Sequence, residues 1–163
     1  MAYAETPPAA MRTPDRTVPA RVPIGSLVAG TPVLTLDGEL PVQYLAPGDR
    51  VVTRTGATEI LTVEVDVLYA AQMIRIAPAA LNHGRPDCEL FLSPAQPLAL
   101  PEATGRTPAA PGCMVAAETL AGQDFIRAEQ VAEVRVFRLH FAEEQVVYAA
   151  GVELLSPVAG SDG

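Results

Sequence analysis

The apolar residues in the middle of the chain recur at every second position rather than at every third or fourth. Within residues 61–67 each odd position is leucine or valine, whereas the even positions are Thr62, Glu64 and Asp66. This alternation is typical of a β-strand with one face toward the core and the other toward water. We therefore expect a half-buried strand over residues 61–67, with its leucine and valine side chains pointing inward.

A second and longer alternation covers residues 133–141. One face carries Arg135, Phe137, Leu139 and Phe141, and the other carries Val134, Val136, Arg138 and His140. Residues 145–150 follow with the pattern of a return strand. The last third of the chain therefore predicts a hairpin in which Arg138 and His140 are near neighbours on one strand.

Turn signals divide the rest of the chain into short elements. Tight turns are indicated at Asp37-Gly38, at Pro47-Gly48-Asp49 and at Thr55-Gly56. We also expect short strands over residues 73–77 and 89–92, and short helical turns over residues 116–120 and 128–133. Many short strands separated by turn residues predict an all-β sandwich or barrel-like fold.

The length of 163 residues is that of one domain. Residues 1–22 are rich in Pro, Ala and Thr without an apolar period, so we expect a disordered arm there. Residues 23–157 are expected to form the folded domain, with a Pro- and Gly-rich loop over residues 101–112. Residues 158–163 are expected to be a flexible tail.

The charge balance narrows the range of partners. There are 11 basic and 19 acidic residues, which gives a net charge of −8. This argues against nucleic-acid binding and against docking on an anionic membrane. All the basic residues are arginine, so lysine-based catalysis is excluded. No apolar run reaches the length of a membrane span and no secretory signal is visible, so we expect a cytoplasmic protein.

The residues that commonly bind zinc are sparse. The only cysteines are Cys88 and Cys113, and the only histidines are His83 and His140. Their spacing matches no common zinc motif, and no Gly-rich phosphate loop is present. We therefore expect reduced thiols, one of them half-buried in a strand, and no metal or cofactor.

Several segments together resemble a known family. They include Gly30-Thr31-Pro32-Val33-Leu34-Thr35 followed by Asp37-Gly38, and Leu45 to Arg54 with its Pro47-Gly48-Asp49. They also include the LxLSPxQxL pattern of residues 90–98 and the residues from Val136 to Gly151. This series resembles Hint (Hedgehog/intein) domains, most closely a bacterial subclass found in alphaproteobacteria. The resemblance covers roughly residues 24–157.

The resemblance implies a compact, all-β, horseshoe-like fold and a self-processing reaction. In such domains a Cys or Ser at the first position attacks the preceding carbonyl, and histidines protonate the departing nitrogen. The first position corresponds to Ser26, so the susceptible bond would be Gly25–Ser26. Thr31 would lie near the site.

The chain departs from the family pattern at several reactive positions. Gln96 stands where the family has the histidine of its SPxH segment, and Arg138 and Glu144 stand where it has two others. An amide cannot carry a proton, although Gln96 could still hydrogen-bond a carbonyl oxygen. His140 is the one imidazole placed to substitute as an acid. The only asparagine is Asn82, so protein splicing that ends in cyclisation of a terminal asparagine is not expected.

Two function hypotheses follow. The first is a Hint-type self-processing domain with impaired catalysis, capable at most of a single-turnover cleavage at Gly25–Ser26. The second is a non-enzymatic module on the same scaffold that binds a protein or peptide partner. In the second case Ser26 is a turn or cap residue, Gln96 a plain loop amide and His140 a half-exposed strand residue. The sequence leaves the oligomeric state open.

Overall fold

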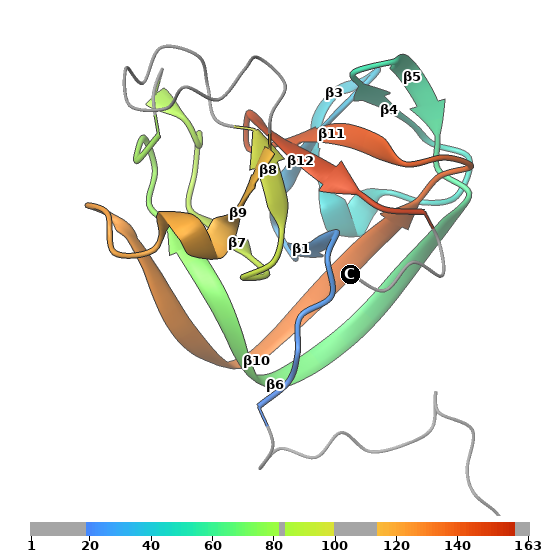
Figure 1. The fold of residues 1–163 in the computed structure, drawn as a ribbon. Coiled ribbons are helices and arrows are strands. Elements are labelled where there is room, and N and C mark those ends of the chain that lie inside the picture. The colour runs from blue at the N-terminus through green and yellow to red at the C-terminus, as the bar shows by residue number, and fades with distance from the viewer. Residues whose placement is uncertain (1–18, 82–83, 100–113, 159–163) are drawn as a thin grey trace, which may run out of the picture.

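The computed structural model describes residues 19–81, 84–99 and 114–158. Within these residues the chain is built almost entirely of strands, which confirms the predicted all-β class (Figure 1). The strands are β1 Ser26–Val28, β2 Pro32–Thr35, β3 Gly38–Pro41, β4 Arg50–Thr53, β5 Gly56–Glu59, β6 Thr62–Ile76, β7 Leu90–Leu92, β8 Pro97–Ala99, β9 Met114–Ala116, β10 Ile126–His140, β11 Gln145–Ala149 and β12 Val152–Ser156. Short 3₁₀ helices lie at η2 Val42–Tyr44 and η4 Ala117–Leu120.

The strands form two sheets. One has the order β1-β10-β6-β7, and the other has the order β3-β2-β4-β11-β12-β8-β9 with β5 paired to β4. In Figure 1 the long strands β6 and β10 form a bent ribbon whose ends rise toward the second sheet. This ribbon gives the molecule the expected horseshoe-like outline, and it holds β1 along one edge of β10.

Two of the predicted turns close hairpins. Thr35 pairs with Gly38 between β2 and β3, and Thr53 pairs with Gly56 between β4 and β5. Gly38 has a φ of 97° and Gly56 a φ of 110°, values that residues with a Cβ rarely adopt. The Asp-Gly and Thr-Gly pairs therefore predicted these turns correctly, because glycine tolerates the positive φ that each turn requires.

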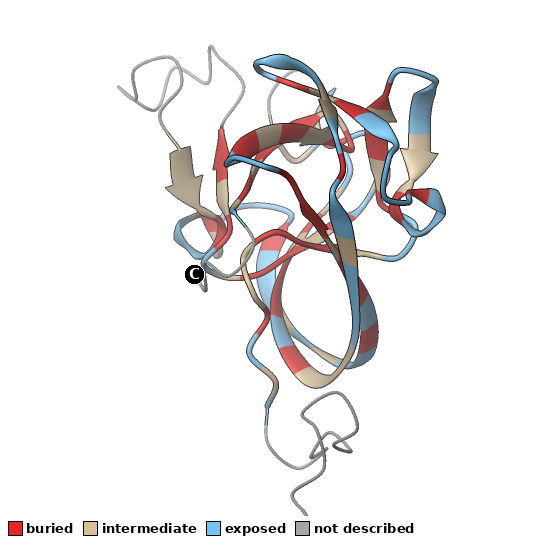
Figure 2. Cartoon of the chain, turned by 90° about the vertical axis from the view of Figure 1, so that its right-hand side faces the viewer, coloured by how far each residue is buried: buried red, intermediate tan, exposed pale blue. Residues whose placement is uncertain are grey.

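The ribbon of β6 and β10 differs from the predictions in two ways. Residues 128–133 are not helical but continue β10, because they pair with residues 69–74 of β6 along much of that length. The leucine and valine face predicted to be buried over residues 61–67 is largely open, with Leu61 49% and Val65 52% exposed. A two-stranded ribbon that extends beyond the body has no second layer to cover both of its faces (Figure 2).

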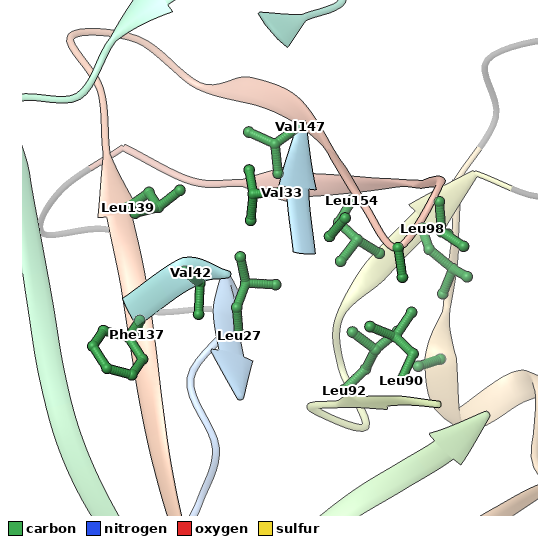
Figure 3. Packing of buried hydrophobic residues seen from close by; sticks show 14 of the residues in the cluster. Leu27, Val33, Val42, Leu90, Leu92, Leu98, Phe137, Leu139, Val147 and Leu154 are labelled. Carbon is green, nitrogen blue, oxygen red and sulfur yellow. The ribbon is translucent and has the colours of Figure 1, made fainter. Parts of the chain in front are cut away.

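The main core lies between the two sheets. Buried residues from many strands point toward one another there, among them Leu27, Val33, Leu92, Phe137 and Leu154 (Figure 3). A second, smaller cluster lies on the ribbon and is formed by Val22, Ala71, Met73, Val134 and Val136. Burial of these side chains is the main force that holds the short strands together.

Parts of the predicted arm, loop and tail lie outside the described residues. Residues 1–18 of the expected arm, the loop over residues 101–112 and residues 159–163 of the expected tail lie outside them. Val22, at the end of the expected arm, packs into the small cluster and is only 4% exposed. In the part of the chain that is described, no helix is long and apolar enough to cross a membrane.

Candidate active site around the Gly25–Ser26 peptide bond

Ser26 is the first residue of β1, which pairs antiparallel with β10. In this register Ser26 lies directly opposite Arg138. Its side chain is fully buried, and its Oγ has no hydrogen-bond partner among the described residues. The Ser26 N–H closes a turn onto the Pro23 carbonyl at 3.3 Å, as the turn alternative has it, but its hydroxyl makes none of the backbone bonds of a capping serine.

Arg138 links Ser26 to the neighbouring strand β6. Its position in β10 pairs with Ser26 on one side and with Glu64 of β6 on the other. The Arg138 Nη2 is bound to the Glu64 carboxylate, and Asp66 Oδ2 lies 3.9 Å from the same nitrogen. The Nε of Arg138 is buried without a partner. Arg138 thus stands opposite Ser26 in the register, with its guanidinium paired to β6 and its Nε–H unused.

His140 lies two positions after Arg138, so both side chains project from the same face of β10. It is 4% exposed, which corrects the alternative of a half-exposed histidine on a solvated face. Its Nε2 is 3.3 Å from Glu64 Oε1, although neither ring nitrogen makes a hydrogen bond. Glu64 thus contacts both basic side chains of this face.

Unpaired polar atoms gather at this place. In the described residues five buried side-chain nitrogen or oxygen atoms lack a hydrogen bond, and four of them belong to Ser26, Arg138 and His140. A buried polar group left unpaired costs about 1–3 kcal/mol. Such groups are rare in folded proteins and point to a strained or reactive site when they cluster.

Gln96 approaches the same peptide bond from the loop between β7 and β8. Its Oε1 accepts a hydrogen bond from the Gly25 N–H at 2.7 Å. Its Nε2 donates to the carbonyl oxygens of Pro97 at 2.9 Å and of Leu155 at 2.8 Å. Gln96 is fully buried, so it is not a plain loop amide. Because both Nε2 hydrogens are engaged, Gln96 positions Gly25 and has no donor left for a developing oxyanion.

The space around Gly25 is small. A cavity of about 10 Å³ is lined by Gly25 and Gln96 together with Leu139, Leu154 and Ser156, among others. The Ser156 hydroxyl is already engaged, since it donates to the Leu139 carbonyl at 2.8 Å. This side of the peptide bond therefore has room for about one water molecule.

Thr31, the remaining residue predicted for the site, makes no side-chain hydrogen bond to this group among the described residues. Thr31 follows β1 and is 6% exposed, and its backbone bonds to Val28 and Val42. Glu144 lies at the exposed turn between β10 and β11. His83 lies outside the described residues. No group of three or more His, Cys, Asp or Glu side chains in the described part of the chain could hold a metal ion.

Glu64 was missed by the sequence reasoning. The alternating pattern of residues 61–67 places it on a polar face, which reads as solvent-facing. Its role depends on the pairing of β6 with β10, which sets Glu64 opposite Arg138. No local signal in the sequence fixes that register, so Glu64 could be found only from the structure.

Comparisons with known proteins agree with this arrangement. The family model of the Hint domain matches residues 25–160. A bacterial intein-like domain from Clostridium thermocellum is similar with a TM-score of 0.57 and 15% identity, covering 82% of this chain and 99% of that one. The MchDnaB-1 intein is similar with a TM-score of 0.51 and 18% identity, covering 78% and 98%. The gp41-1 intein gives a TM-score of 0.51 and 17% identity, covering 81% and 97%. No curated protein matches the sequence.

At these identities the solved structures establish the fold alone. The family match is broader evidence, since it covers most of the chain and begins at Gly25, directly before the buried serine. The two-sheet fold described above is thus shared with these solved structures. The chain belongs to the Hint domain family.

Proposed function

We propose that this domain carries out a slow, single-turnover self-cleavage at the Gly25–Ser26 peptide bond. The observation that carries this proposal is the cluster of buried, unpaired polar atoms of Ser26, Arg138 and His140 beside that bond. A purely structural site of this kind would be filled with partners or with apolar groups. Membership of a family related to self-processing proteins supports the same conclusion.

The reaction proceeds in two steps. First, Ser26 Oγ attacks the carbonyl carbon of Gly25, a C–O bond forms and the C–N bond to Ser26 breaks. The hydroxyl proton passes to the Ser26 nitrogen, which becomes a free amine, and an ester joins Gly25 to Ser26 Oγ. Water then hydrolyses the ester, which gives a Gly25 carboxylate and restores the Ser26 hydroxyl.

Each neighbouring residue has a role in this scheme. The His140 imidazole takes the proton from Oγ and delivers it to the departing nitrogen, as imidazoles do near neutral pH. The Arg138 guanidinium offers its unused N–H to the oxygen that becomes negative in the transition state. Glu64 is a positioning residue, since it contacts both basic side chains. Gln96 holds Gly25 through its backbone N–H.

We expect the reaction to be slow for two reasons. A serine hydroxyl is a weaker nucleophile than a thiol, a few per cent of which is ionised at neutral pH. Gln96 orients Gly25 but cannot transfer a proton, and general acid–base help is typically worth about 10²–10⁴ in rate. One imidazole, that of His140, therefore serves both proton transfers.

The test is intact mass spectrometry of the chain carrying an N-terminal tag, followed over days with and without hydroxylamine. A fragment that begins at Ser26 is expected, and hydroxylamine should speed its release because it cleaves esters. Ser26→Ala should abolish the fragment. Ser26→Cys should raise the rate, and dithiothreitol should then release the thioester. Thr58→Ala is the matched control, because it removes a hydroxyl from β5, which among the described strands pairs with β4 alone.

His140→Gln separates the proton-transfer role from folding, since it keeps a polar side chain without an imidazole. It should lower the rate by at least about tenfold while the thermal unfolding midpoint stays close to that of the parent. An unchanged mass in the parent and in Ser26→Cys would overturn self-cleavage. The alternative of a non-enzymatic module that binds a protein or peptide would then stand.

A further inference from the structure

We propose that residues 20–25 form a docked recognition segment, and that the groove holding it requires an apolar side chain at position 22 and glycine at position 25. The ligand class is a short peptide joined to Ser26, irregular from residue 20 and closed at residues 23–26 by a turn. The effect on cleavage rests on the proposed function, whereas the docking itself does not. Figure 1 shows this segment running up along the β6–β10 ribbon to the start of β1.

The side chain of Val22 fills an apolar site on the ribbon. It is 4% exposed and packs with Ala71 and Met73 of β6 and with Val134 and Val136 of β10. Such contacts are unexpected in a segment whose Pro- and Ala-rich composition predicts a free arm. The ribbon therefore offers a built pocket for one side chain, placed four residues before the serine.

Backbone hydrogen bonds hold the segment at three points. The Ala20 N–H donates to the Tyr69 carbonyl at 3.1 Å. The Ser93 hydroxyl donates to the Val22 carbonyl at 2.7 Å, and Gln96 accepts from the Gly25 N–H at 2.7 Å. Ser93 and Gln96 are both buried, and they lie in the same loop between β7 and β8.

This pair of loop residues is matched to the segment. Ser93 and Gln96 are three residues apart, and so are the two backbone groups that they bind, the Val22 carbonyl and the Gly25 N–H. Backbone bonds carry no information about side chains. They fix the segment's register, and the selectivity then comes from the positions where side chains meet the protein.

Gly25 is one of those positions, for two independent reasons. Its φ is 90°, in the region that residues with a Cβ adopt only under strain. A Cβ built on Gly25 would also lie 3.0 Å from Pro157 Cδ, closer than ordinary van der Waals contact. Any other residue would have to move out of the position that aligns its carbonyl with Ser26.

Docking is tested by limited trypsin digestion in a Ser26→Ala background, so that the chain stays intact whether or not self-cleavage occurs. Trypsin cuts after arginine, and Arg21 precedes Val22 directly. We expect the Arg21–Val22 bond to be protected in this parent protein. Val22→Ala should raise the rate of cutting about tenfold, since it removes most of a buried valine side chain. Val22→Asp should raise it further.

Val65→Ala and Val65→Asp are the matched controls, because Val65 lies on the same ribbon but is 52% exposed. They should leave the cutting rate at Arg21 unchanged. Ser93→Ala supplies a second perturbation of the groove that leaves the segment's own sequence intact, and it should also speed cutting. The docking is overturned if Arg21 is cut as fast in the folded parent as in the urea-unfolded chain, or if Val22→Ala changes nothing.

The sequence requirement is then tested on chains that retain Ser26. Val22→Ala, Ser93→Ala and Gly25→Ala should each lower the rate at which the Ser26 fragment forms, with Gly25→Ala at least about tenfold slower. Equal rates in these variants and the parent would overturn the selectivity. Absence of cleavage in every chain would contradict the proposed function, while the trypsin result would still decide the docking.

Discussion

At the scale of single residues, the Gly25–Ser26 junction combines two kinds of polar group. Gln96 is buried with every hydrogen bond of its amide made, so it stabilises the loop that holds Gly25. Ser26 and His140 are buried with polar atoms unpaired. A fold keeps such groups only if the surrounding core tolerates their cost or if they act chemically. This contrast is why the reactive role is assigned to Ser26 and His140 and the positioning role to Gln96.

Cys88 supports a prediction about pH at the same scale. It is half-buried in the bend before β7, and burial raises the pKa of its thiol, helped by the charges of Asp87, Glu39 and Glu89. A raised pKa means less thiolate at a given pH, and the thiolate is the reactive form. In a Cys113→Ser variant, alkylation by iodoacetamide at pH 8 should be severalfold slower than for a small thiol. The rate should still be rising at pH values where that thiol has levelled off.

Unfolding in urea is the control for this measurement, since it removes burial and should restore the ordinary alkylation rate. Added salt should speed the reaction slightly, because it screens the three carboxylates. If Cys88 reacts at pH 8 as fast as the small thiol, burial is not protecting it.

The sequence proposes residues for the site but not their contacts. The family resemblance points to Ser26, Gln96 and Arg138, which stand at positions of its motif, and strand alternation points to His140, two residues beyond Arg138 on the same face. Neither could show that Gln96 binds Gly25, or that Glu64 reaches Arg138 and His140. Those contacts depend on strand register and loop packing between segments distant in the chain, which local patterns do not encode.

At the scale of elements, alternation predicted strands correctly and misjudged their length and burial. The short hairpins were predictable, since glycine at a positive φ marks each turn. The β6–β10 ribbon was not, because residues 128–133 gain more from pairing with β6 than from a local helical turn. Leu61 and Val65 remain exposed because the apolar face of an alternating strand is buried only where a second layer packs against it.

The start of β10 carries a prediction about backbone strain. Phe125 directly precedes β10, has a φ of 68° and is 76% exposed. A residue with a Cβ in this conformation destabilises the folded state by about 1–2 kcal/mol. Glycine removes that strain, but it also gives the unfolded chain more freedom, which offsets about 0.4–1 kcal/mol of the gain. Phe125→Gly should therefore raise the free energy of unfolding by about 0.5–1 kcal/mol. Urea unfolding measures this, with Phe125→Ala as the control that keeps the strain and should gain nothing.

Phe125→Gly keeps the carbonyl that accepts the Ala77 N–H at 3.0 Å, so the hydrogen bond that closes this end of the ribbon is preserved. A lower free energy of unfolding for Phe125→Gly than for Phe125→Ala would mean that the phenylalanine ring makes contacts worth more than the strain.

At the scale of the whole molecule, one core joins the two sheets, and the site lies where they meet. The first sheet supplies Ser26, Arg138 and His140, whereas Gln96 stands in the loop that runs from β7 of the first sheet to β8 of the second. The geometry of the Gly25–Ser26 bond therefore depends on how firmly the two sheets are packed. The amino-acid composition and the alternation of apolar residues could predict such a core. They could not predict which residues would form its centre.

Leu92 of β7 tests that dependence, because it is fully buried in the core just before the loop that carries Ser93 and Gln96. In a Ser26→Ala background, Leu92→Ala should lower the free energy of unfolding by about 2–5 kcal/mol, the sum of lost burial and a cavity. Leu36→Ala is the matched control at 60% exposure, and it should change stability by no more than about 0.5 kcal/mol. Urea unfolding compares the two directly. Equal losses would contradict a core centred between the sheets, whereas the expected difference would show that the buried Leu92 side chain stabilises that core.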